Sequence, residues 1–276
     1  MKLIIAFFMA WGNFITLPCP YKRWDGALKN LMLAFLPSVG AVVAGLWCLL
    51  AWALQLLHLP ITIQAIALEF YLFAICGFMH LDGFMDCNDA ILSRRPLEER
   101  QRILKDSNVG AFAVVTLVFL LIAQFTCMVT LAMTSGPARY LFFFLLPILS
   151  RGSAGLQVMD HRPIGHSQYK EDWTRPKGGD RAASLIQMGV YIAAAFGIAA
   201  YVIRYSVNYS TFSIAGAFGT YLMIPLGALT VCVVTGLIAG TYARRQLGGM
   251  SGDIAGYVIC WSELGGCLAM SVLVAL

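Results

Sequence analysis

Residues 110–134, GAFAVVTLVFLLIAQFTCMVTLAMT, form an apolar run without one charged residue. A helix needs roughly 20 mostly apolar residues to cross a hydrocarbon layer about 30 Å thick, so this run predicts a membrane-spanning helix. Similar runs predict spans near 31–57, 61–79, 110–134, 139–158, 182–203, 212–240 and 254–276. Pro225 and Gly227 interrupt the run at 212–240, which leaves open one kinked span or two shorter segments. We expect an all-α bundle of about seven membrane helices forming one domain, 1–276.

The composition supports a membrane protein and disfavours other classes. The chain is 59% hydrophobic and 12% charged, with a mean hydropathy of +0.76. A net charge of +5 in such a chain sets orientation in the bilayer, so no nucleic-acid partner is expected. The eight cysteines lie mostly inside apolar runs and lack CxxC spacing, which indicates neither a disulfide framework nor a zinc site.

The distribution of cationic residues tests the predicted spans. With an inner N-terminus, all of the 19 Lys and Arg residues fall on the inner side except Arg139, Arg151 and Arg204. This pattern satisfies the positive-inside rule. It predicts that loops 80–109 and 159–181 and the turn 244–253 share the cytoplasmic side of the inner membrane. Residues 1–20 lack a signal-peptide cleavage site and predict an interfacial helix. Residues 96–105, PLEERQRILK, predict a short helix on the membrane surface.

The stretch 77–90, GFMHLDGFMDCNDA, carries the most chemical information. On a helix, Asp82, Asp86 and Asp89 project from one face, and their mutual repulsion calls for a cation, protons or basic groups. Carboxylate oxygens without the spacing of a Cys/His site suit Mg²⁺ or Mn²⁺, which also bind phosphate oxygens. We therefore predict a metal-bridged phosphate ligand on a helix that directly continues the preceding span. The alternative is a solvated acidic helix end, which the intervening apolar residues disfavour.

His80, beside this cluster, is a candidate general base, metal ligand or orienter of the carboxylates, and its alternative role is structural. In the stretch 105–112, KDSNVGAF, Asp106 either joins the metal site from a second helix or caps that helix near Ser107. In the stretch 248–256, GGMSGDIAG, Asp253 is either a functional acid or a helix cap.

Acids and bases inside the spans point to polar cavities, because intramembrane charges are costly unless they face a partner. Glu263 lies in the last predicted span, about two and a half helical turns deeper than Asp253, and Glu69 and Arg151 interrupt other apolar runs. Glu69 and Arg151 either pair with each other or line a polar cavity, and their spacing does not decide between these arrangements.

Together, the segments HLDGFMDCNDA (80–90), KDSNVGAF (105–112) and SGDIAGYVICWSE (251–263) resemble the signature of the cobalamin synthase family, the adenosylcobinamide-GDP ribazoletransferases. Residues 17–20, LPCP, and the Ser150-Arg151 pair extend the resemblance over most of the chain. The chain departs from the family pattern at Phe78, where a second glycine is common, and at Cys260, where an acid is common.

The resemblance implies an integral membrane transferase of cobalamin (vitamin B12) biosynthesis. Such an enzyme transfers the cobinamide phosphate of adenosylcobinamide-GDP to the ribose 3′-hydroxyl of α-ribazole or α-ribazole 5′-phosphate, releasing GMP. Metal on the three aspartates, Mg²⁺ or alternatively Mn²⁺, would neutralise the pyrophosphate. We expect catalytic roles for His80, Asp106 and Asp253. The residues expected to bind or support the substrate are Glu69, Lys105, Arg151 and Glu263.

Two other functions compete with this reading. A CDP-alcohol phosphatidyltransferase also uses clustered aspartates on membrane helices, but the Asp-Gly-x-x-Ala-Arg arrangement is missing after Asp82-Gly83. A cation transporter would place acids near the midplane of the bilayer, whereas the densest cluster here lies at a boundary. The expected partners are the two substrates and the bilayer, and the sequence leaves a homo-oligomer open.

Overall fold

A computed structural model of the chain describes residues 1–134, 136–165, 178–206 and 219–276. These residues form helices, with a single isolated bridge between Pro163 and Met250 and no strand within the described ranges. The long helices are α3 (Leu36–Leu56), α7 (Ala111–Met133), α8 (Pro137–Asp160), α9 (Gly178–Ser206), α11 (Ile224–Leu247) and α12 (Gly252–Ala275). The shorter ones are α1 (Lys2–Phe14), η1 (Gly26–Leu28), α2 (Lys29–Ala34), α4 (Ile61–Ala74), α5 (Met79–Leu92), α6 (Leu97–Ile103) and the π turn η2 (Gly219–Met223).

The number of apolar helices confirms the predicted membrane bundle. Among the described residues, six helices are long and apolar enough to cross a membrane, and the bent pair α4 and α5 makes a seventh if it is one span. The helix is continuous from Gly219 to Leu247 through η2 and α11, so this part of the run 212–240 is one span. Residues 212–218 lie outside the described ranges.

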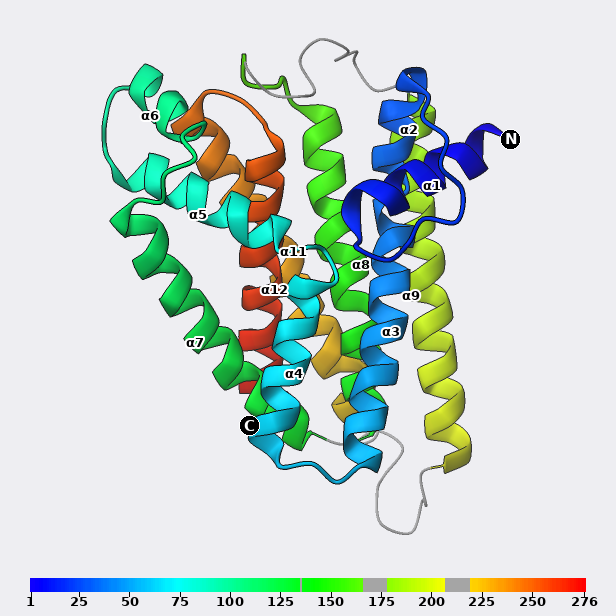
Figure 1. Ribbon diagram of the computed structural model, residues 1–276. Coiled ribbons are helices and arrows are strands. Elements are labelled where there is room, and N and C mark those ends of the chain that lie inside the picture. The colour runs from blue at the N-terminus through cyan, green and yellow to red at the C-terminus, as the bar shows by residue number, and fades with distance from the viewer. Residues whose placement is uncertain (135, 166–177, 207–218) are drawn as a thin grey trace.

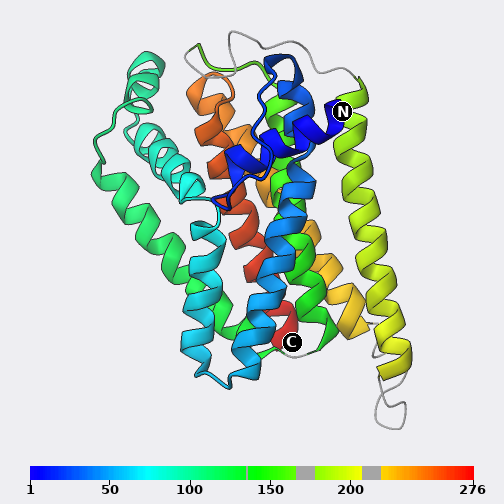
Figure 2. The same ribbon diagram turned by 45° about the vertical axis from the view of Figure 1, so that its right-hand side comes forward.

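The segments expected to share one side of the membrane lie at one end of the bundle (Figures 1 and 2). Helices α1, α2, α5 and α6 are at this end, together with the turn between α11 and α12 and the described parts of loop 159–181. Helix α1 crosses this end of the bundle, as expected of an interfacial helix, and α6 is the short helix predicted from residues 96–105.

Helix α8 runs through the centre of the bundle and anchors its core. It is the most buried of the spans, with 89% of its apolar window inside the protein. At the far end of the core, Phe143 of α8 stacks on Trp47 of α3 with ring centroids 4.0 Å apart, and the Trp47 indole N–H donates to the Leu68 carbonyl of α4. Helices α3, α4 and α8 are thereby locked together.

The chain bends by 81° between α4 and α5, so the prediction that the aspartate helix directly continues the preceding span is wrong. Gly77 and Phe78 both have φ of 61°, in the left-handed region, which ends α4 and redirects the chain. Helix α5 consequently runs across the end of the bundle in Figure 1. The bend directs all three aspartates of α5 away from the axis of α4.

Candidate active site

The bend between α4 and α5 is tied to the end of α1. The Thr16 backbone N–H and the Thr16 hydroxyl both donate to the Ile75 carbonyl, at 2.8 and 3.2 Å. A Cβ added at Gly77 would lie 3.2 Å from the Thr16 methyl group, so the two segments are in close contact. These contacts bring Phe14, the last residue of α1, to the start of α5.

Two glycines bring α5 and α12 into backbone contact. A Cβ added at Gly83 would lie 2.5 Å from the Asp253 carbonyl oxygen, and one at Gly256 would lie 3.0 Å from the His80 carbonyl oxygen. Small residues allow such close approach of membrane helices. Beside the contact, Phe84 of α5 stacks on Tyr257 of α12, with ring centroids 5.8 Å apart. Asp82 and Asp253, from segments far apart in the sequence, are therefore neighbours.

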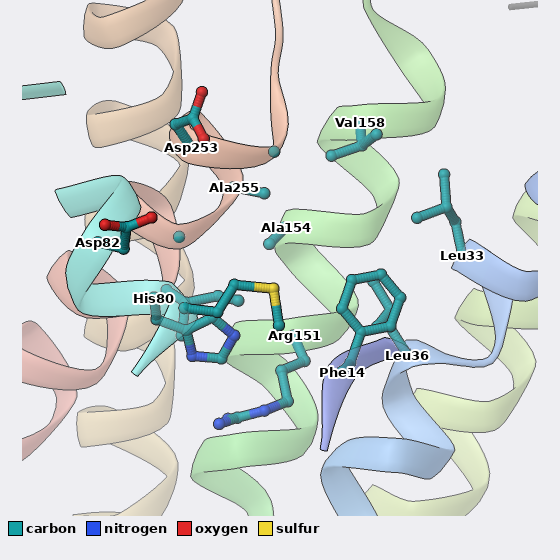
Figure 3. Close-up of a pocket in the computed structure, with 14 residues that line it drawn as sticks. Phe14, Leu33, Leu36, His80, Asp82, Arg151, Ala154, Val158, Asp253 and Ala255 are labelled. Atoms are coloured by element: carbon teal, nitrogen blue, oxygen red, sulfur yellow. The ribbon is translucent and has the colours of Figure 1, made fainter. Parts of the chain in front are cut away.

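A cavity of about 140 Å³ lies beside this contact. Figure 3 shows Asp82 of α5 and Asp253 of α12 on one side of it, with His80 and Arg151 below them. The structure therefore brings together four of the residues singled out in the sequence: His80, Asp82, Arg151 and Asp253.

The aspartates of α5 share one helix but differ in their surroundings. Asp82 is exposed, whereas Asp86 and Asp89 are half-buried. The pKa of Asp86 is raised to about 7, mainly by burial and also by the charges of Asp82, Asp253 and Asp89. The Asp89 carboxylate points at Gly110, the N-cap residue of α7, where an added Cβ would overlap it. Asp82, Asp86 and Asp253 thus form one region of concentrated negative charge.

This charge pattern suits a divalent cation, although the protein alone does not enclose one. Within the part of the chain that the structure describes, no three His, Cys, Asp or Glu side chains are arranged to hold a metal ion. Mg²⁺ is usually held by one or two carboxylates together with waters and substrate phosphates, and the carboxylates here fit that mode. The metal site on Asp82, Asp86 and Asp89 stays a prediction.

Asp253 is free to face the cavity because another residue caps its helix. The Ser251 hydroxyl accepts a hydrogen bond from the Ile254 N–H and donates one to the Asp253 carboxylate, at 3.3 and 3.2 Å. The preceding turn is fixed by backbone hydrogen bonds of 2.9 Å in both directions between Met250 and the segment 162–164. Ser251, not Asp253, is therefore the N-cap of α12.

Below the cavity, Arg151 and Glu263 form a buried ion pair. Arg151 Nη1 lies 2.6 Å from Glu263 Oε1, and both side chains are 2% exposed. The Ser150 hydroxyl donates to the same oxygen at 2.9 Å, and Arg151 Nη2 donates to the Cys76 sulfur at 3.4 Å. A buried charge is tolerated when it is paired and hydrogen-bonded. Arg151 is accordingly held in one place at the floor of the cavity.

Three sequence candidates lie elsewhere. Glu69 is buried in α4, and its Oε1 has no hydrogen-bond partner among the described residues. Arg151 pairs with Glu263 and not with Glu69. Lys105 and Asp106 are exposed on the loop before α7. Asp106 accepts hydrogen bonds from the backbone and side chain of Asn108. It does not cap α7, whose N-cap is Gly110.

The structure also adds residues that sequence reasoning missed. The wall opposite Asp82 and Asp253 is apolar and includes Phe14, Leu33 and Leu36 (Figure 3). Nothing in the sequence distinguishes these residues from the other apolar residues of helices.

Comparison with known proteins points to one family. A family model described as cobalamin-5-phosphate synthase matches residues 6–271. The chain is 30% identical over 268 residues to an adenosylcobinamide-GDP ribazoletransferase of Clostridium perfringens strain 13, covering 96% of each chain. It is 32% identical over 268 residues to the protein of the same name from Clostridium botulinum strain Alaska E43, again covering 96% of each chain. No solved structure matches it.

Proposed function

We propose that this chain, which belongs to the cobalamin-5-phosphate synthase family, is an adenosylcobinamide-GDP ribazoletransferase. Membership of the family confirms the expectation of a transferase in cobalamin synthesis. In the proposed reaction, the ribose 3′-hydroxyl oxygen of α-ribazole or its 5′-phosphate attacks the phosphorus attached to cobinamide. A new P–O bond forms, the P–O bond to the GMP leaving group breaks, and the hydroxyl proton passes to a base.

The observation that carries the proposal is the meeting of Asp82 and Asp253 at one cavity with Arg151 at its floor. Attack on a pyrophosphate requires neutralisation of its charge and accurate positioning of the nucleophile. Arg151 supplies a guanidinium at the floor of the cavity, and its pairing with Glu263 holds that group in place and compensates its charge, so most of the neutralisation would fall to a cation at the carboxylates. The short distance between α5 and α12 fixes the two carboxylates relative to each other.

One or two of the carboxylates of this region, Asp82 and Asp86 foremost, would hold a divalent cation together with phosphate oxygens of the substrate, with Mg²⁺ preferred and Mn²⁺ as an alternative. When bound, such a cation neutralises phosphate charge and stabilises the leaving group. Asp89, against the N-terminus of α7, adds to the negative potential and lies at the edge of this group.

Two groups are candidates for the base. His80 lines the cavity and is 6% exposed. Burial lowers the pKa of His80 well below its usual range, with the charge of Arg151 acting in the same direction, so its imidazole is neutral at pH 7, but the same shift makes it the weaker base. Asp253 is the other candidate, because it lines the cavity from α12. Asp106 is not part of the mechanism we propose, because it is exposed and its carboxylate accepts hydrogen bonds from Asn108.

We place the reaction at the cytoplasmic face of the inner membrane. The bundle is that of an integral membrane protein, and the cavity lies at the end that carries most of the Lys and Arg residues. The positive-inside rule assigns that end to the cytoplasm. A transporter would be expected to concentrate acids at mid-depth, whereas the carboxylates of this cavity lie at the end of the bundle.

The test is the identity of the leaving nucleotide. Purified protein in detergent should release GMP from adenosylcobinamide-GDP only when α-ribazole or its 5′-phosphate is present. Release of CMP from CDP-diacylglycerol, or no GMP release, would reject the proposal in favour of the phosphatidyltransferase or transporter readings. Asp253→Ala should lose single-turnover GMP release while keeping its thermal stability, because Ser251 remains as the N-cap. Glu98→Gln, on the surface helix α6, is the control variant.

A further inference from the structure

The cavity has two chemically different walls (Figure 3). One wall carries the carboxylates of Asp82 and Asp253, on α5 and α12. The facing wall is apolar and consists of Phe14 at the end of α1, Leu33 in α2 and Leu36 at the start of α3. A site for a pyrophosphate alone would not need an apolar wall, so this wall indicates that a second, apolar group is bound.

The apolar wall is held rigidly in place. A Cβ added at Gly155 of α8 would lie 2.8 Å from Leu36 Cδ1 and 3.0 Å from the Leu33 carbonyl oxygen. The chain around Leu33 and Leu36 therefore packs directly on the α8 backbone. Phe14 is held from the other side, because Thr16 is hydrogen-bonded to the Ile75 carbonyl at 2.8 Å. The wall is preorganised and need not form around a ligand.

The size of the cavity limits which part of the substrates can enter it. Sites for drug-sized ligands typically have volumes of about 300–1,000 Å³, and this cavity has about 140 Å³. It is too small for a corrin macrocycle or a whole nucleotide, but it suits a single ring system, with the rest of the substrate extending beyond it. The pyrophosphate belongs at the carboxylate wall, where a cation would bind. The apolar wall faces it and suits a flat, uncharged aromatic group, which Phe14 can contact through its ring face or edge.

We propose that Phe14, Leu33 and Leu36 form the subsite for the aromatic base of the nucleoside substrate and determine which base is accepted. This inference rests on the proposed function and deepens it. With the base against this wall, the ribose lies between the apolar and acidic sides, and its hydroxyl faces the pyrophosphate. The wall selects apolar bases because a polar base would leave its hydrogen-bonding groups without partners there.

The subsite predicts a measurable preference among bases. One methylene group in an apolar pocket changes specificity about 10–200-fold. The purified protein should therefore use α-ribazole, whose base carries two methyl groups, at least ~10-fold better in kcat/KM than the benzimidazole nucleoside without them. It should use the corresponding adenine nucleoside less well still, because that base carries an amino group and additional ring nitrogens.

The test compares this preference among variants of the full-length protein. Phe14→Ala and Leu36→Ala should each reduce the ratio of kcat/KM for α-ribazole over the adenine nucleoside by at least ~10-fold, while KM for adenosylcobinamide-GDP stays unchanged. Phe14→Leu and Leu36→Met preserve most of the side-chain volume and are included in case the alanine variants do not fold. They should lower the same ratio by a smaller factor. Phe7→Ala is the matched control, because Phe7 is half-buried on the same helix and lies outside the cavity.

Two results would overturn the subsite. One is an unchanged base preference in all four cavity variants despite GMP release. The other is equal binding of α-ribazole by wild-type protein and both Phe14 variants in equilibrium dialysis, which needs no turnover. Absence of GMP release from wild-type protein with every nucleoside would instead reject the proposed function. Weaker α-ribazole binding by the Phe14 variants would support the subsite even in that case.

Discussion

Gly83→Ala is expected to inactivate the protein by separating the two helices that carry Asp82 and Asp253. The new methyl group would lie 2.5 Å from the Asp253 carbonyl oxygen and 2.7 Å from its Cα. Ordinary carbon contacts are about 3.5–4.0 Å, so α5 must move by roughly 1 Å relative to α12. A misplacement of about 1 Å can reduce turnover about 100-fold, and overpacking costs about 1–3 kcal/mol of stability.

The assay is single-turnover GMP release, with thermal unfolding in detergent measured in parallel. Gly45→Ala in α3 is the matched control, because a Cβ there would meet no atom within 4 Å. Alanine is the better helix former, so this control should keep full activity and equal or greater stability. A Gly83→Ala protein with normal activity and normal stability would refute the close packing of α5 on α12 as the basis of the site.

Three further predictions test the bend, the charge cluster and the topology. Phe78→Gly should be more stable than Phe78→Ala by about 1 kcal/mol, because both remove the ring that packs on Phe70 but only glycine relieves the left-handed φ of 61°; a lower unfolding temperature for Phe78→Gly than for Phe78→Ala would contradict this reasoning. Because the pKa of Asp86 is raised to about 7 in the folded protein, the metal-free fold should lose stability as pH rises from about 4 through 7, and less so in Asp86→Asn. Since Asp86 is half exposed, we expect Asp86→Asn to be more stable to unfolding than wild-type protein by only about 1 kcal/mol at pH 8 in EDTA. An equal difference in stability at pH 5 would argue against the coupled cluster. In intact cells lacking the native cysteines, His58→Cys should react with an impermeant thiol reagent and Glu98→Cys should not; the reverse pattern would invert the topology.

The sequence was sufficient to predict the membrane bundle because apolar length is a local property. The run 110–134 became α7 (Ala111–Met133), and the final run became α12. The bend after α4 was not predicted, because hydropathy measures the length of an apolar run but not its direction. Gly77 was a local signal for a turn. The following Phe78 did not indicate a turn, because a bulky residue with left-handed backbone angles is uncommon.

The acidic side of the site was also largely predictable. Asp82 and Asp253 were identified from local motifs, and the structure places them at the same cavity. The pairing of Arg151 with Glu263 could not be predicted, because it joins residues of two distant helices and no spacing rule selects the partner. The apolar wall was missed for a related reason: Phe14 and Leu36 acquire a special position only when α1 and α3 are packed beside α5 and α8.

The central claim is that the carboxylates at this cavity act on a pyrophosphate with the help of a divalent cation. The most direct measurement is single-turnover GMP release from adenosylcobinamide-GDP and α-ribazole by wild-type protein and by Asp82→Asn, in EDTA and after addition of Mg²⁺. Wild-type protein should be inactive in EDTA and recover fully with Mg²⁺. Asp82→Asn should insert and purify normally yet release little or no GMP in either condition. Equal GMP release by the two proteins, or by wild-type protein with and without Mg²⁺, would contradict the account.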